Sequence, residues 1–196
     1  MAARDLVSRK VFLASPIAGS MLPQEDLVEP RLLEPLADRI RIQAGRFPGT
    51  EVLDLGSPEG YVGREIAGDA PSWTVYTTNE VDEAPDNLET VTIDGFGDLG
   101  FEDDQLAALV GVWIQDPIQA WKPSILKEWK RVLAPAGRLM FLFRGPGSRN
   151  PDAPRQLPSQ AVAMLEDAGF EHAAERRLQF FPDGSDLVRL RAVKPE

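Results

Sequence analysis

Two kinds of segment alternate along this chain. Short apolar runs typical of buried strands occur at residues 51–55, 72–77, 89–93, 106–114 and 138–144. Segments with apolar residues three or four apart, typical of amphipathic helices, occur at residues 29–45, 61–67, 124–133 and 159–168. Strands that alternate with helices favour a largely parallel sheet with helices on both faces.

The end of the chain departs from this alternation. Two further strands, around Glu171 to Phe181 and Asp186 to Val193, are separated only by the turn residues Pro182-Asp183-Gly184. Such a pair is typical of an antiparallel hairpin. The sequence therefore predicts an α/β fold: a Rossmann-like, seven-stranded, mostly parallel sheet with a C-terminal antiparallel hairpin at its edge and helices on both faces.

Length and pattern predict a single domain. The 196 residues are 43% hydrophobic, enough for one sizeable core, and no repeat or linker divides them. We expect one domain over residues 1–196, with residues 1–30 as an N-terminal extension or cap.

Composition excludes several kinds of site. The chain has no cysteine, which rules out disulfides, thiolate catalysis and cysteine-bound metals, and its one histidine, His172, cannot form a histidine-rich metal site. We therefore expect no metal. The net charge of -10 disfavours nucleic acid and anionic membranes as partners, because a phosphate backbone is bound mainly through lysine and arginine.

The chain also lacks the signals of export or membrane insertion. No apolar run approaches the length of a membrane span. The apolar part of the N-terminus is short and is interrupted by Ser15 and Pro16, unlike a secretory signal, so we expect a cytoplasmic protein.

The stretch EVLDLGSPEG, from Glu51 to Gly60, is the clearest candidate for a ligand site. A short strand ends near Asp54 and leads into a turn that contains Gly56 and Gly60. Glycine lets a backbone approach a ligand closely, because a side chain would collide with it. The same turn could equally be a tight connection from a strand to a helix. Pro58, between the two glycines, has a fixed φ and a ring where the backbone would be expected to lie close to the ligand.

Four stretches in order resemble the class I S-adenosylmethionine-dependent methyltransferases, particularly the small-molecule group. They are VLDLGSPEG, DGFGDLGFEDDQLAALVGVWIQDP, ILKEWKRVLAPAGRLMFLF and MLEDAGFEHAAERR. The resemblance covers Leu32 to Val193. A dinucleotide-binding oxidoreductase matches less well, because its loop has three glycines at wider spacing and its sheet lacks the final hairpin.

The resemblance implies S-adenosylmethionine as cofactor and a set of residues to hold it. Asp54 would lie near the methionine part, the turn containing Gly56, Ser57 and Gly60 would contact the ligand, and an acid at the end of the second strand would bind the ribose. The candidate cofactor-binding residues are Asp54, Gly56, Ser57, Gly60, Glu80, Asp94, Gly95 and Trp113. No catalytic residue is assigned, since a transferase that aligns donor and acceptor does not require a base.

Several of these candidates have a simpler alternative role. Glu80 has the features of a solvated loop acid, and Asp94-Gly95 is a common turn pair. Asp94 would otherwise bind the adenine amino group. Trp113 either lines the pocket or packs in the core.

The chain also departs from the family pattern on the adenosine side. Pro58 replaces the middle glycine, and the second strand ends in Thr77-Thr78-Asn79, so the ribose-binding acid is missing or displaced to Glu80. Only about 16 residues separate Thr78 from Asp94, too few for a helix and its loops. The sequence therefore supports two hypotheses: a methyltransferase with a small-molecule acceptor, or a catalytically inactive protein of this fold with a binding or regulatory role. A homodimer through the terminal hairpin is possible.

Overall fold

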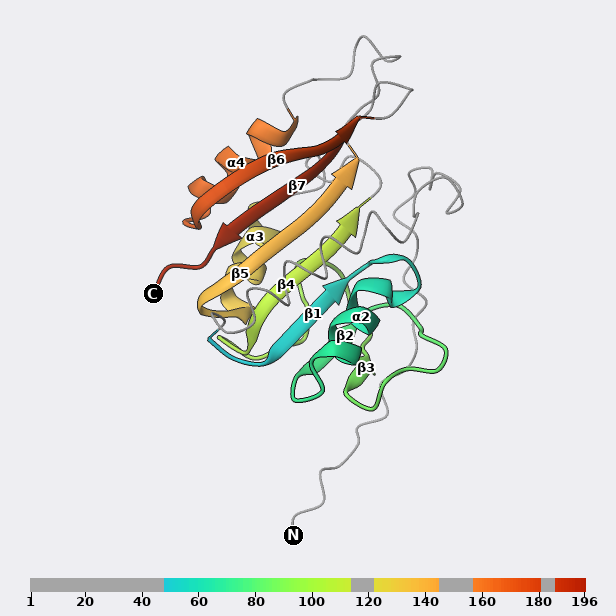
Figure 1. Ribbon diagram of the computed structural model, residues 1–196. Helices are drawn as coiled ribbons and strands as arrows, with labels where there is room; N and C mark the ends of the chain where they lie inside the picture. The colour runs from blue at the N-terminus through green and yellow to red at the C-terminus, as the bar shows by residue number, and fades with distance from the viewer. Residues whose placement is uncertain (1–47, 114–121, 145–156, 181–185) are drawn as a thin grey trace.

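The computed structural model describes residues 48–113, 122–144, 157–180 and 186–196. These residues form a seven-stranded sheet in the order β3-β2-β1-β4-β5-β7-β6 (Figure 1). The strands are β1 Glu51–Leu55, β2 Thr74–Thr77, β3 Leu88–Thr90, β4 Leu106–Trp113, β5 Leu133–Arg144, β6 Glu171–Phe180 and β7 Asp186–Val193. Neighbouring strands from β3 to β5 are parallel, while β7 is antiparallel to both β5 and β6. The predicted fold class is confirmed.

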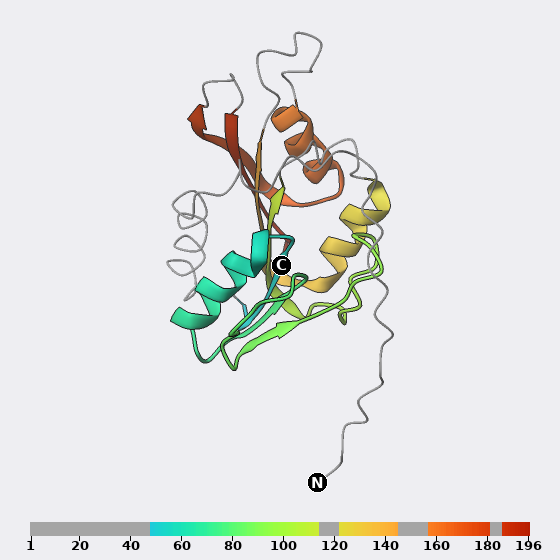
Figure 2. The same ribbon diagram turned by 90° about the vertical axis from the view of Figure 1, so that its right-hand side faces the viewer.

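Helices cover both faces of the sheet (Figure 2). Helix α2, Tyr61–Asp69, lies on one face, and α3, Pro123–Val132, and α4, Leu157–Asp167, lie on the other. Because side chains alternate between the faces of a strand, each strand contributes to two cores. Val52, Val75 and Val110 pack with α2, whereas Leu53, Leu109 and Phe141 pack with α3 and α4. In α3, Trp129 is fully buried, as its helical spacing predicts.

Two element boundaries differ from the prediction. Strand β5 begins at Leu133, not at Arg138, because Leu133 already pairs with Leu106 and residues 134–137 form an irregularity in the ladder. Ala136 has a φ of 60° there, and its amide donates to the Lys194 carbonyl. Helix α4 begins at Leu157, two residues before the predicted start, which places Pro158 in the first turn where proline is tolerated.

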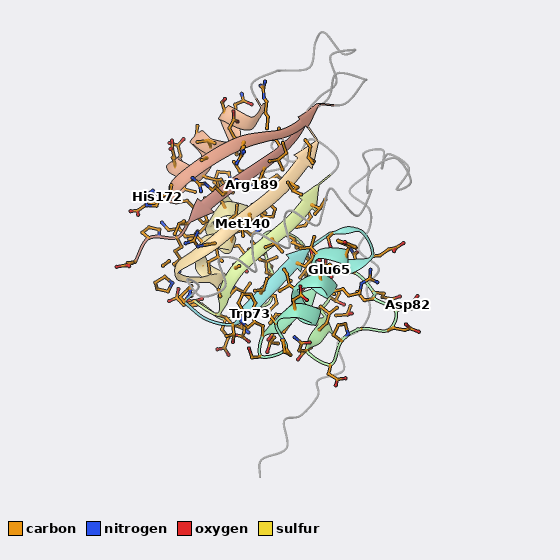
Figure 3. The ribbon with its side chains drawn as sticks, in the orientation of Figure 1. Glu65, Trp73, Asp82, Met140, His172 and Arg189 are labelled. Carbon is orange, nitrogen blue, oxygen red and sulfur yellow. The ribbon has the colours of Figure 1, made fainter. Side chains whose placement is uncertain are left out.

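The terminal hairpin is at the sheet edge, but only β6 is outermost. Strand β7 lies between β5 and β6, so Arg189 is on an internal strand and His172 is on the edge strand (Figure 3). His172 is exposed and has a φ of 55°.

Neither the connection from β2 to β3 nor the one from β3 to β4 contains a helix, and the structure describes both in full. In the second connection, four partly buried apolar side chains pack against the α3 side of the core together with Tyr76 of β2, namely Val91, Ile93, Phe96 and Phe101. The segment from Thr78 to Asp94 contains no helix, as its shortness predicts. The β3–β4 loop covers part of the α3 side of the sheet with apolar side chains.

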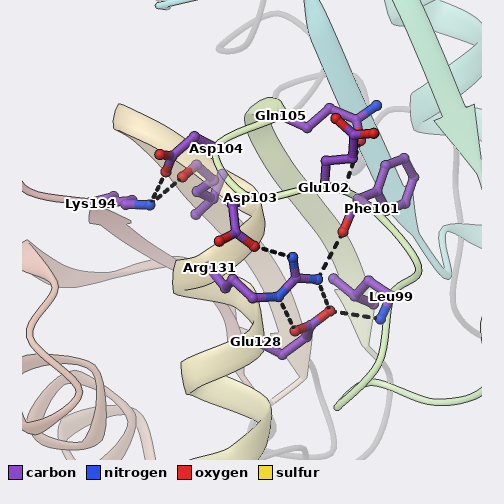
Figure 4. A network of polar contacts seen from close by, with 10 residues as sticks. Leu99, Phe101, Glu102, Asp103, Asp104, Gln105, Glu128, Arg131 and Lys194 are labelled. Carbon is purple, nitrogen blue, oxygen red and sulfur yellow. Dashed lines mark hydrogen bonds and ion pairs between the residues drawn. The ribbon is translucent and has the colours of Figure 1, made fainter.

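Helix α3 fixes this loop through Arg131 (Figure 4). The Arg131 guanidinium donates to the Asp103 carboxylate at 2.6 Å, to the Phe101 carbonyl at 2.8 Å and to Glu128 at 2.7 Å. Glu128 also accepts the Leu99 amide at 3.0 Å. Hydrogen bonding from Arg131 holds the pKa of Glu128 below its usual value.

Several predicted features lie outside the described residues. They are the N-terminal extension 1–30, the helix 29–45 and the turn 182–184.

Candidate functional site

The candidate site lies at the carboxyl edge of the parallel strands. In register, Asp54 of β1 lies between Thr77 of β2 and Val110 of β4, so the segments that follow these strands meet at one edge. The strand order reverses between β1 and β4, which have their crossovers on opposite sides. In open α/β sheets, ligands bind outside the carboxyl ends of the strands at such a switch point. The turn from β1 into α2 is at this point.

Asp54 is fully buried and is bonded to its own chain. Its Oδ1 accepts the Ser57 amide at 3.2 Å, and its Oδ2 accepts the Ser57 hydroxyl and the Gly63 amide, the latter at 2.8 Å. Burial raises the pKa of Asp54 from 3.8 to about 6, and the hydrogen bonds from Ser57 and Gly63 offset part of that rise. Asp54 therefore anchors the first turn of α2 to β1.

Ser57 completes this anchor. Its side chain is fully buried, and its Oγ donates to Asp54 and accepts the Val62 amide at 3.1 Å. The N-cap residue of α2 is Gly60, which has no side chain to cap the helix, so Asp54 and Ser57 satisfy the first-turn amides instead. The structural alternative considered for this turn is thus realised. The ligand-binding roles of Asp54 and Ser57 stay predictions.

Both glycines of the turn adopt left-handed backbone conformations. Gly56 has a φ of 82° and Gly60 a φ of 62°, conformations that favour glycine. The Gly56 amide donates to the Thr78 hydroxyl at 3.1 Å. A Cβ at Gly60 would lie 2.4 Å from Val81 Cγ2, a distance at which atoms overlap. Gly60 is therefore required by a contact within the protein as well as by its φ.

The end of β2 reaches back over the turn. Asn79 donates through Nδ2 to the Ser57 carbonyl, and its own amide donates to the Thr77 hydroxyl at 3.3 Å. The Thr78 amide donates to the Asp54 carbonyl at 3.2 Å. Thr78, Asn79 and Val81 were not predicted from the sequence as partners of the turn. The signal was the Thr77-Thr78-Asn79 run, which replaces an acid with groups that can bond to a neighbouring backbone.

The remaining candidates lie apart from this network. Glu80 is exposed, and Asp82 points outward from the same loop (Figure 3). Asp94 and Gly95 are exposed in the loop after β3, where the Gly95 carbonyl accepts the Asp98 amide at 3.1 Å. No described contact joins Glu80, Asp94 or Gly95 to the turn. Trp113 ends β4 opposite Phe143, and its side chain lies outside the described part.

The location of the turn suits S-adenosylmethionine, but the residues at the end of β2 do not suit its ribose. The turn lies at the switch point. Asp94 follows β3, which is two strands away from β1, at the same edge of the sheet. The end of β2, however, offers the neutral side chains of Thr78 and Asn79 where a ribose would require an acid, and both are bonded to the turn. The residues present therefore leave the ribose without its expected carboxylate.

Within the described ranges, no helix is long and apolar enough to cross a membrane. In the same residues, no three His, Asp or Glu side chains are grouped so that they could hold a metal ion.

Comparison with known proteins identifies the fold. No protein-family model matches the sequence, and no curated protein matches it significantly. Among solved structures, phosphoethanolamine N-methyltransferase 2 of Haemonchus contortus in complex with S-adenosyl-L-methionine matches with a TM-score of 0.60 at 13% identity, over 81% of this chain and 53% of that one. The chain thus spans about half the length of this relative.

Other matches have different activities. The 16S rRNA (adenine(1408)-N(1))-methyltransferase of Catenulisporales acidiphilia has a TM-score of 0.58 at 14% identity, over 82% of this chain and 92% of that one. The [4+2]-cyclase SpnF has a TM-score of 0.59 at 16% identity, over 83% and 80%. At such identities the likeness shows fold and not activity. The chain therefore has the fold of the class I S-adenosylmethionine-dependent methyltransferases.

Proposed function

We propose that this chain is an S-adenosylmethionine-dependent methyltransferase that acts on a small molecule. The observation that carries the proposal is the position of the β1–glycine turn–α2 unit, at the switch point of a sheet with the order β3-β2-β1-β4-β5-β7-β6. This is where an open α/β sheet binds its ligand. The solved structures of the same fold include one in complex with S-adenosyl-L-methionine, which supports the choice of cofactor.

The proposal gives each part of the site a role. Gly56 and Gly60 would let the backbone approach the cofactor, and Asp94 would accept a hydrogen bond from the adenine amino group. Asp54 and Ser57 hold the start of α2 in place and so fix the turn. The cofactor supplies an activated methyl group, and the protein contributes alignment of that group with the acceptor.

Titration calorimetry with S-adenosylhomocysteine tests this proposal. The wild-type chain is expected to bind, and Asp94→Ala is expected to lose about five- to thirtyfold in affinity, the effect of one hydrogen bond to the ligand. Asp86→Ala is the matched control, because Asp86 is an exposed aspartate before β3, at the opposite end of the strands. Absence of heat with the wild-type chain at high ligand concentration would refute the proposal.

A second candidate is a protein of this fold that does not transfer methyl groups and serves as a binding or regulatory partner. The hydrogen bonds that join Thr78 and Asn79 to the turn favour this second candidate. They occupy backbone groups of the turn that would otherwise be open to a cofactor. Binding of the cofactor together with methyl transfer to a small molecule would exclude this candidate.

A further inference from the structure

We propose that Asn79 and Val81 set the affinity of the glycine turn for adenosyl ligands, because they close the turn over the place of the ribose. This inference rests on the proposed function in one respect, the identity of the ligand. The segment from Thr78 to Val81 follows β2 directly and contacts the turn at three points, through Thr78, Asn79 and Val81. A ligand that occupied the Cβ side of Gly60 would require this segment to move away.

The first contact is polar. The Asn79 side chain donates to the Ser57 carbonyl and so joins the end of β2 to the middle of the turn. An amide oxygen is also a weaker partner for ribose hydroxyls than a carboxylate, because hydrogen bonds to an ionised acceptor are about twice as strong. Asn79 thus both holds the segment on the turn and lacks the charge that would favour a ribose there.

The second contact is apolar. Val81 lies so close to Gly60 that even one added carbon atom on Gly60 would come within 2.4 Å of its Cγ2. Val81 also packs against the core on the α2 side, together with Tyr61. A ligand atom placed where a side chain of residue 60 would begin would overlap Val81. On that side of Gly60, the space that glycine leaves is filled by the chain itself.

The third contact completes the closure. The Gly56 amide donates to Thr78, the Ser57 amide donates to Asp54, and the Gly60 amide donates to the Ser57 carbonyl at 3.0 Å. Pro58 has no amide hydrogen to offer. These three backbone amides therefore already donate hydrogen bonds within the protein. A ligand could accept hydrogen bonds from them only by replacing their present acceptors.

The closure is weak enough to open. Asn79 contributes one described hydrogen bond to the turn, which has a net effect of about two- to tenfold on an equilibrium constant. When the competent state is a minor one, the apparent affinity is reduced by its population. Variants that lose one contact of the closed state should therefore bind an adenosyl ligand about three- to tenfold more tightly.

The test measures binding and closure separately. Wild type, Asn79→Asp, Asn79→Ala and Val81→Ala are titrated with S-adenosylhomocysteine, and amide hydrogen exchange is followed for residues 56–63 without ligand. Val162→Ala is the matched control, because Val162 is a partly buried valine that packs against the core from α4. Asn79→Asp is expected to gain most, since it loses the bond to Ser57 and supplies a carboxylate.

Each result decides one question. Faster exchange of residues 56–63 in the Asn79 and Val81 variants, with tighter binding and an unchanged control, supports the inference. Faster exchange with no binding by any variant supports the closure but refutes the proposed function. Equal affinity in the wild type and all variants overturns the inference and leaves the proposed function standing. Unchanged exchange in the variants also overturns it.

Discussion

At the scale of single residues, Gly60 is a glycine that the fold itself requires, whether or not a ligand binds. Its φ of 62° and the closeness of Val81 both explain it without a ligand. Gly60→Ala is expected to cost about 2–4 kcal/mol in the free energy of unfolding, from overlap with Val81 and from the left-handed backbone. Val81→Ala should relieve the overlap but not the cost of the left-handed backbone.

A double-mutant cycle measures that overlap. Gly60→Ala, Val81→Ala and the double variant are compared by urea denaturation, and a coupling of about 1–2 kcal/mol is expected because the two side chains are in contact. Additive effects would show that Val81 does not constrain Gly60.

Asp54 gives a second prediction, in the pH dependence of stability. Below pH 3.8 its carboxyl is protonated in both states; between pH 3.8 and about 6 it ionises only in the unfolded chain. The contribution of Asp54 to stability therefore falls as the pH rises through this window, by about 3 kcal/mol in all, and is constant above it.

Asp54→Asn removes this titration. The difference in the free energy of unfolding between wild type and Asp54→Asn, measured in urea at pH values from 4 to 8, is expected to change up to about pH 6 and then to level off. Asp98→Asn is the matched control, because Asp98 is an exposed aspartate. Parallel curves for wild type and Asp54→Asn would contradict the prediction.

At the scale of elements, a loop without a helix covers part of the α3 side of the sheet. The β3–β4 loop has no helix and depends on α3 for its position, through Arg131 and Glu128. Arg131→Ala is expected to cost about 1–3 kcal/mol, because it removes bonds to a carbonyl and to two carboxylates. It should also accelerate amide exchange in residues 99–105.

Lys127→Ala is the control for this effect, since Lys127 is exposed on the same helix. Hydrogen exchange and urea denaturation of the two variants decide the matter. Equal stability and equal exchange in Arg131→Ala and Lys127→Ala would show that the loop is held by its apolar side chains alone.

At the scale of the whole molecule, two cores share one sheet. Leu53 contributes to the core with α3 and α4, while its neighbour Val52 contributes to the core with α2. Loss of either core would expose one face of the same strands. We therefore expect the chain to behave as one domain.

Coincident unfolding tests this expectation. In urea, far-UV circular dichroism, tryptophan fluorescence and the exchange of amides in α2 and α4 are expected to share one midpoint. Trp73 and Trp129, one in each core, give fluorescence signals from both sides of the sheet. Two separate midpoints would show two independently folding units.

Much of this architecture was predictable from local patterns. The continuous apolar run at 106–114 predicted a central strand, and the spacing of Leu126, Trp129 and Val132 predicted the buried face of α3. Burial depends on periodicity, which a sequence contains directly. Boundaries were less predictable. The start of β5 at Leu133 depends on its pairing with Leu106, a contact between residues far apart in the chain.

The sequence by itself determined the class of fold and the place of a ligand turn, because strand and helix periodicity and the glycine positions are local properties. Only the tertiary structure decided how that turn is used. The register of β1 and β2 brings Thr78, Asn79 and Val81 onto Gly56, Ser57 and Gly60 across more than twenty residues of chain. Hydrogen bonds and steric contacts at that separation depend on the folded position of both segments, which no local pattern specifies.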